Sequence, residues 1–99
     1  MTIPIVENMV SENGNAIANQ FIITVRTPKT IVRYFKSYDS IIAMKVSKGI
    51  GGKQITLDKN TWDYSKTTGK YRNMFLGETK KETQAKIDKG IYHLADLNK

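Results

Sequence analysis

The hydrophobic pattern of this chain changes period at residues 58–60, and this change constrains the fold more than any other feature. Before it, residues 21–58 alternate between apolar and polar side chains, as strands with one buried face do. After it, residues 62–90 carry apolar residues at helical spacing. A run of strands followed by two helices and a last strand predicts an α+β domain with a mostly antiparallel sheet.

The alternation predicts a small sheet of four or five strands. Turn residues such as Pro28 and Asp39 separate the alternating segments. In the segment 40–46, strict alternation would point Ile42, Met44 and Val46 inward. The predicted strands are 21–27, 31–38, 40–46 and 53–58, with 91–97 closing the chain.

The first 20 residues allow two interpretations. Residues 2–6 suit a short edge strand, because Pro4 excludes them from the centre of a sheet. Asn13-Gly14 is the dipeptide best suited to a tight type I′ turn. Residues 1–20 are therefore either a peripheral hairpin or a mobile segment, and within 11–20 the cluster of asparagines favours a mobile loop over a hairpin tip.

Two short helices are predicted, at about 66–76 and 80–89. Gly77 and Gly90 stand where each helix would end. The second helix begins with Thr79-Lys80-Lys81-Glu82, which matches a capping box. Candidate N-caps of the first helix are Ser65, Thr67 and Thr68, and its packing face would be Tyr71, Met74 and Phe75.

The length, composition and charge predict one domain, residues 1–99, in the cytoplasm. The chain has no cysteine, no apolar run long enough for a membrane helix and no basic N-terminal region typical of a signal peptide. Of the net charge of +7, residues 26–59 carry +6. This electropositive middle third would attract a polyanion or an acidic protein surface, although solvated lysines are also common for solubility alone.

No motif in the chain predicts catalysis, a metal site or a cofactor. Gly52-Lys53 resembles the end of a P-loop, but Ser47 and Gln54 stand where a glycine and a hydroxyl residue are needed. The segment 49–52 matches the GxxG of KH domains, but its flanks read as strands. His93 has no nucleophile or carboxylate at a telling spacing. We therefore expect a protein that is not an enzyme.

Cations and aromatic residues interleave in two parts of the chain, at 33–38 and 62–75. This composition can stack bases and hold phosphates, it can form a protein interface, or it can be core packing with lysines at the rim. The predicted contact residues are Arg33, Lys36, Lys48, Lys53, Trp62, Lys66, Lys70, Arg72, Lys80 and Lys81.

Residues 34–46 and 57–98 carry a resemblance to known sequences. The matching segments are the strand SYDSI, the block WDYSKTTGKYRN, the tripeptide FLG, and KE leading to GIY. The chain resembles a group of small uncharacterised proteins of phages and mobile elements of Gram-positive bacteria. The resemblance implies no catalytic residues, but it implies a binding role in a host cell, such as host takeover or counter-defence.

Two functional hypotheses follow. In the first, the protein is an inhibitor or adaptor of a host protein or protein–nucleic-acid complex, acting against defence as an anti-CRISPR protein does. In the second, it binds DNA or RNA directly through a basic aromatic surface. Under either hypothesis the protein would be a monomer or a homodimer, and a homodimer could form through an exposed edge strand.

Overall fold

The computed structural model describes residues 3–49 and 52–99, which form a mixed sheet of six strands and two helices. The α+β prediction is confirmed, but the sheet has more strands than the four or five expected, because residues 5–10 also pair into it. The first helix has the predicted bounds, and the second ends one residue early. The elements are β1 (Ile5–Val10), β2 (Ala16–Arg26), β3 (Ile31–Ser37), β4 (Ser40–Ser47), β5 (Lys53–Asp58), α1 (Lys66–Leu76), α2 (Lys80–Asp88) and β6 (His93–Ala95).

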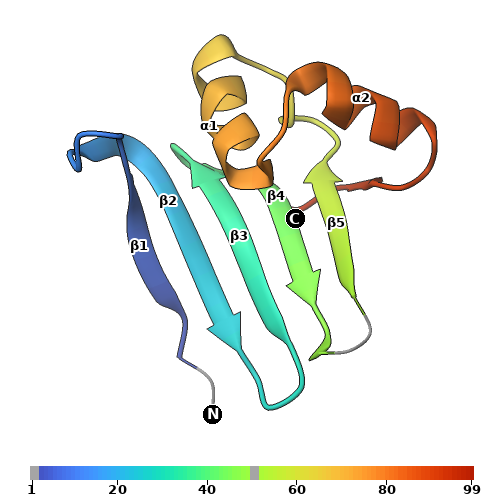
Figure 1. Ribbon diagram of the computed structural model, residues 1–99, viewed down its shortest axis with the longest axis horizontal. Helices are drawn as coiled ribbons and strands as arrows, with labels where there is room; N and C mark the ends of the chain where they lie inside the picture. The colour runs from blue at the N-terminus through green and yellow to red at the C-terminus, as the bar shows by residue number, and fades with distance from the viewer. Residues whose placement is uncertain (1–2, 50–51) are drawn as a thin grey trace.

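The strands lie in the sheet in sequence order, β1 to β6. The first five are joined by hairpins and pair antiparallel, whereas β6 pairs parallel to β5. A parallel pair needs a crossover, and α1 and α2 form it. Both helices therefore lie on the same face of the sheet, over the end where β5 finishes (Figure 1).

The N-terminal residues form the first hairpin of the sheet. β1 and β2 pair along their length, and the connection closes with the Ser11 backbone N–H donating to the Asn15 carbonyl at 2.8 Å. Gly14 takes a φ of 82°, the left-handed conformation that glycine adopts without strain. Of the predicted edge strand 2–6, residue 2 lies outside the described residues.

The core lies between the sheet and the two helices. Its buried apolar residues are Phe35, Ile42, Ala43, Leu57, Phe75 and Tyr92. Phe35 of β3 stacks on Phe75 of α1, with ring centroids 5.8 Å apart. Beside them, the hydroxyls of Ser37 and Thr68 share a buried hydrogen bond of 2.9 Å, which fixes the start of α1 over β3.

A β-bulge in β4 decides which side chains face the helices. Ile41 pairs with Lys36, but the next pair is Ala43 with Phe35, so Ile42 is the extra residue. Ile42 and Ala43 are both buried in the core, and the alternation beyond them is shifted by one residue. The expectation that Met44 and Val46 point inward is therefore wrong, because the shift moves both to the face away from the helices.

The helix ends follow the local signals of the sequence. Ser65 is the N-cap of α1 and its hydroxyl accepts from the backbone N–H of Thr68 at 3.1 Å. Thr79 and Glu82 form the predicted capping box of α2. Gly77 follows α1 with a φ of 72°. The cap of α2 is Lys89 instead of the predicted Gly90, which follows it.

Candidate functional site

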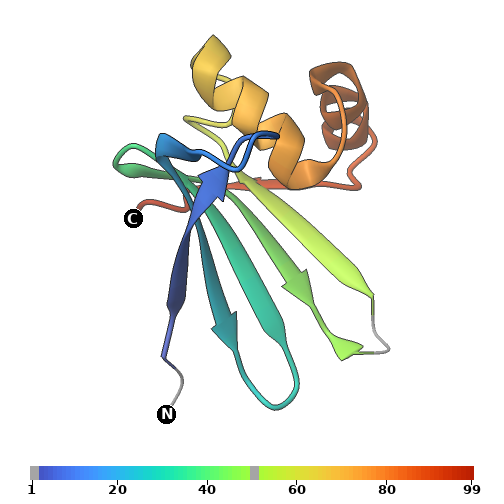
Figure 2. The ribbon, with the colours of Figure 1, turned by 60° about the vertical axis from the view of Figure 1, so that its left-hand side comes forward.

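The strands extend past the helices toward the turn at 27–30 and toward the connection between β4 and β5 (Figure 2). The uncovered part of the helix-bearing face carries four cationic residues. In one row of the sheet, Arg33 lies directly opposite Lys45. In the next row, Arg26 and Lys53 lie on the outer strands, with Ile31 and Ser47 between them. Paired residues share a face, so these four side chains form one surface. We call Arg26, Arg33, Lys45 and Lys53 the cationic sheet surface.

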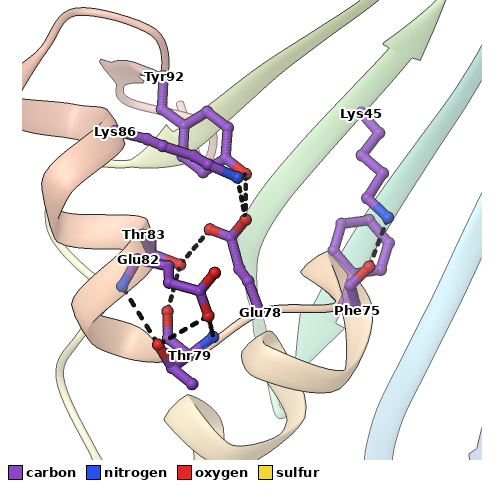
Figure 3. Close-up of polar contacts among 8 residues, drawn as sticks. All are labelled: Lys45, Phe75, Glu78, Thr79, Glu82, Thr83, Lys86 and Tyr92. Carbon is purple, nitrogen blue, oxygen red and sulfur yellow. Dashed lines mark hydrogen bonds and ion pairs between the residues drawn. The ribbon is translucent and has the colours of Figure 1, made fainter.

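Lys45 stands where this surface meets α1. Its ammonium group donates a hydrogen bond to the carbonyl of Phe75, the last buried residue of the helix, and lies 4.6 Å from the centre of the Phe75 ring (Figure 3). Burial, and then the charges of Lys53 and Arg33, lower the pKa of Lys45, while Glu78 opposes them. The neighbouring cations are thus close enough to repel one another.

Within the described residues, no carboxylate forms an ion pair with the cationic sheet surface. The ion pairs within residues 3–49 and 52–99 join Arg72 and Lys80 to Asp63, and Lys86 to Glu78. None of these involves the surface. Like charges opposite one another destabilise a sheet, so a bound anion would relieve a repulsion that the fold contains.

The structure brings together part of the predicted contact set. Arg33 and Lys53 lie on the cationic sheet surface, and Lys48 stands at the adjacent turn. Lys45 and Arg26 were missed by the sequence analysis. For Lys45 the missing signal was the bulge, since without it Met44 would stand opposite Arg33. The GxxG segment at 49–52 lies partly outside the described residues.

Arg72 does not face a partner, and this prediction is corrected. Its side chain is 1% exposed, because residue 72 lies on the same stripe of α1 as the buried Thr68 and Phe75. The guanidinium donates to the carbonyl of Trp62 at 2.6 Å and to the side-chain oxygen of Asn73 at 2.9 Å. Burial lowers the pKa of Arg72. Arg72 thus fastens the 59–65 turn to α1.

The remaining predicted residues are scattered. Trp62 is half-buried and packs against the core, and Lys36 lies on the opposite face of the sheet from Arg33. A shallow groove of about 700 Å³ separates the 61–65 turn from the starts of the two helices, and Lys66, Lys70 and Lys80 line it. Asp63 also lines the groove and pairs with Lys80 at 2.8 Å, which offsets part of the charge. Lys81 lies outside this groove, on α2.

Figure 3 shows a second polar cluster, centred on Glu78 in the loop between the helices. The carboxylate accepts from the Thr83 hydroxyl at 2.6 Å, the Lys86 ammonium at 2.6 Å and the Tyr92 hydroxyl at 2.7 Å. Burial would raise the pKa of Glu78, but the hydrogen bonds from Lys86, Thr83 and Tyr92 outweigh it and lower the pKa. Every contact is satisfied within the protein, so the cluster ties α2 to the chain leading into β6.

In residues 3–49 and 52–99, no group of three or more His, Cys, Asp or Glu side chains could hold a metal ion. His93 is exposed on β6, opposite Thr56. Neither helix is long and apolar enough to cross a membrane.

Comparison with known proteins gives one match. The model of a family of unknown function, DUF8033, matches residues 5–91, from the start of β1 to the loop before β6. No curated protein and no solved structure matches the chain.

Proposed function

We propose that this chain, which belongs to the DUF8033 family of unknown function, is a non-enzymatic protein that binds the phosphate backbone of DNA or RNA. The contact would be the cationic sheet surface, with Lys48 beside it. Phosphate contacts of this kind supply affinity without sequence readout.

The observation that carries the proposal is the opposition of Arg33 and Lys45 in neighbouring strands. Both side chains lie on the helix-bearing face, and no carboxylate pairs with either in the described residues. The lowered pKa of Lys45 reflects burial and then the nearby Lys53 and Arg33. Phosphate groups along a nucleic-acid strand would supply the missing negative charge.

The arrangement favours backbone contacts over stacking on bases. Tyr34 and Arg33 are adjacent in β3 and therefore point to opposite faces of the sheet. The ring nearest the cationic surface is Phe75, which is buried against Phe35. The aromatic platforms that single-strand binders use are therefore not on the same face as the cations. We expect duplex DNA and duplex RNA to bind at least as well as single strands.

The double variant Arg33→Gln/Lys53→Gln tests this proposal. Affinity for a duplex of arbitrary sequence is measured by fluorescence anisotropy over a series of salt concentrations. Each lost phosphate contact should reduce the slope of log K against log salt by about 0.9 on duplex DNA. The double variant should therefore lose affinity and about 1.8 units of slope.

The matched control is Lys59→Gln/Lys89→Gln, which makes the same change in net charge. Both side chains are exposed, lie toward the helix end of the sheet and make no hydrogen bond or ion pair in the described part of the chain. The control should keep the wild-type slope. If both double variants weaken binding equally, net charge rather than the cationic sheet surface explains the affinity. No binding by the wild type at low salt would refute the proposal outright.

A second candidate function is the inhibitor or adaptor of a host protein that the resemblance to phage proteins implies, in the cytoplasm of the host. The observation that favours it is an exposed ridge on α1. Lys66, Lys70 and Met74 are spaced four residues apart, and Met74 is 48% exposed although apolar. Such a ridge suits docking into a groove of a partner protein, for example a CRISPR effector.

A pull-down from a nuclease-treated host lysate tests the second candidate. It should recover one partner at a stoichiometric ratio with the wild type, and much less with Met74→Asp. Recovery that depends on Arg33 and Lys53 would instead indicate bound nucleic acid. So would a partner that is recovered from an untreated lysate but not from the nuclease-treated one.

A further inference from the structure

The sheet face opposite the helices is apolar and uncovered by any helix. In Figures 1 and 2 both helices lie on the other side of the sheet. The C-terminal segment crosses this face at one end, where Asn98 bonds to the backbone of Ile41 through both atoms of its amide. The residues in the middle of the face form two rows across β2, β3 and β4, namely Val25, Val32 and Val46, and Ile23, Tyr34 and Met44. We call these six residues the open sheet face.

The open sheet face is not part of the core. None of its six residues belongs to the core cluster or packs against it, and each is half-buried by its neighbours in the sheet. An antiparallel sheet with one face in water normally alternates apolar residues inward with polar residues outward. Here the outward rows are apolar as well, which is the pattern of a sheet that lies between two layers.

The total surface is larger than that of a compact monomer of the same mass. The chain exposes 6607 Å², whereas a compact monomer of 11.2 kDa exposes about 5700 Å². The excess of about 900 Å² is close to the roughly 800 Å² that each partner buries in a stable protein–protein interface. A partner of ordinary size on the open sheet face would bury an area of this order.

The charges favour a second copy of this chain as that partner. The two rows carry no charged side chain, so a polyanion or a charged protein surface finds nothing complementary there. Lys36, the next residue of β3 on this face, lies 6.0 Å from the centre of the Phe21 ring at the end of the rows. The cationic sheet surface is on the other side of the sheet, so it faces away from a second copy and its repulsion is screened by salt.

The edges of the sheet are less suited to self-association than this face. The edge strand β1 has an irregular register between Asn8 and Val10, and the opposite edge, β6, has three residues. Short and bulged edges hinder pairing between sheets. An edge-to-edge dimer, which the sequence left open beside a monomer, is therefore disfavoured.

We propose that two copies of this protein pack open sheet face against open sheet face, forming a symmetric dimer with the helices on its two outer sides. Aligned sheets pack in this way about 10 Å apart, with their side chains interdigitating. A two-fold axis would bring the Val25–Val32–Val46 row of each copy into the same interface.

Sedimentation equilibrium of the wild type and of Val32→Asp tests the dimer. The wild type should show a mass that rises with concentration from 11.2 kDa toward twice that value. Val32 is central in its row, so an aspartate there would be buried without a partner in the dimer but not in the monomer. We expect its dissociation constant to rise by about 100-fold or more. The control is Ile91→Asp, which changes an apolar residue that is 57% exposed in the loop before β6, and it should dimerise as the wild type does.

A measurement on the wild type alone covers the case in which Val32→Asp does not fold. Methyl NMR spectra recorded across a range of protein concentrations should show shifts at Val25, Val32 and Val46, with Ile42 and Ile87 unchanged, since both pack in the core. A wild type that stays monomeric, or one whose methyl shifts lie elsewhere, overturns the proposal. Monomeric wild type would leave the open sheet face to a different protein.

Discussion

Replacing Glu78 with alanine should destabilise the protein more than a substitution in a loop usually does. The carboxylate accepts three hydrogen bonds, and a bond to a charged group contributes about 1.5–3 kcal/mol. The free energies of the three hydrogen bonds do not add in full, because two of the three donors can find other partners. Thr83 keeps its bond to the Thr79 carbonyl at 3.2 Å, and the partly exposed Lys86 can turn to water. Tyr92 is buried and loses its hydroxyl partner.

The expected loss is therefore about 3 kcal/mol out of a total of about 5–15 kcal/mol. A change of this size lowers the melting temperature of a chain of 99 residues by about 12–24 °C. Urea denaturation followed by circular dichroism measures the free energy of unfolding. The control is Glu12→Ala, a glutamate that is exposed and unpaired in the described chain.

The pH dependence separates the charge of Glu78 from its packing. Because its hydrogen bonds lower its pKa from the ordinary value of 4.5, Glu78 binds a proton more weakly in the folded than in the unfolded chain. Its stabilising contribution is thus fully present above pH 4.5 and is lost as the pH falls through the lower folded pKa. The stability difference between wild type and Glu78→Gln should shrink between pH 7 and pH 3. A difference that stays constant over this range would refute the reasoning, as would an unchanged melting temperature for Glu78→Ala.

Three further substitutions should change the free energy of unfolding, each measured by urea denaturation at neutral pH. Gly77→Ala should cost about 1 kcal/mol, because the residue has a φ of 72° and alanine is strained there; equal stability would argue against the left-handed end of α1. Thr79→Ala should cost about 1 kcal/mol through loss of the capping box, whereas Thr79→Ser should keep most of the wild-type stability because serine can cap in the same way. Gln20→Met should add about 1 kcal/mol, since the fully buried amide of Gln20 has no hydrogen-bond partner in the described residues; a loss of stability would mean that the amide is satisfied in solution.

Local signals in the sequence predicted the helices well. Ser65, Thr79 and Gly77 act through hydrogen bonds or backbone angles within a few residues, so their effect can be read without knowing the tertiary structure. The strands β3 to β5 and residues 21–26 of β2 were also recognisable, because alternation is a local pattern. The first five residues of β2 were not predicted as a strand. The α+β class followed from the order of these elements.

Register and helix rotation could not be predicted in the same way. The bulge at Ile42 depends on how β3 and β4 fit together, and it reverses the faces of Met44 and Lys45. Arg72 was expected at a contact surface because cations and aromatic residues interleave at 62–75. It is buried instead, and its guanidinium donates to the carbonyl of Trp62, ten residues earlier. In both cases the deciding contact joins two different segments of the chain instead of residues within one helix or strand.

The interleaving of cations and aromatic residues was misleading for a physical reason. In a strand, neighbours such as Arg33 and Tyr34 point to opposite faces, so a mixed sequence produces two separate surfaces instead of one mixed surface. One is cationic and shares its face with the helices, and the other is apolar. The sequence pattern that suggested a single stacking platform thus contains two different contact surfaces.

This separation makes the two proposed interactions independent. The cationic sheet surface and the open sheet face are on opposite sides of one sheet, so a dimer would present two cationic surfaces facing away from each other. Arg33→Gln/Lys53→Gln should weaken nucleic-acid binding without changing the dimer, while Val32→Asp should break the dimer and leave the salt slope per chain unchanged. A dimer could hold two duplexes at once, and energy transfer between two labelled duplexes should then require the dimer. If the monomeric variant bridges duplexes as well as the wild type does, the cations that bind nucleic acid are not confined to one side of the sheet.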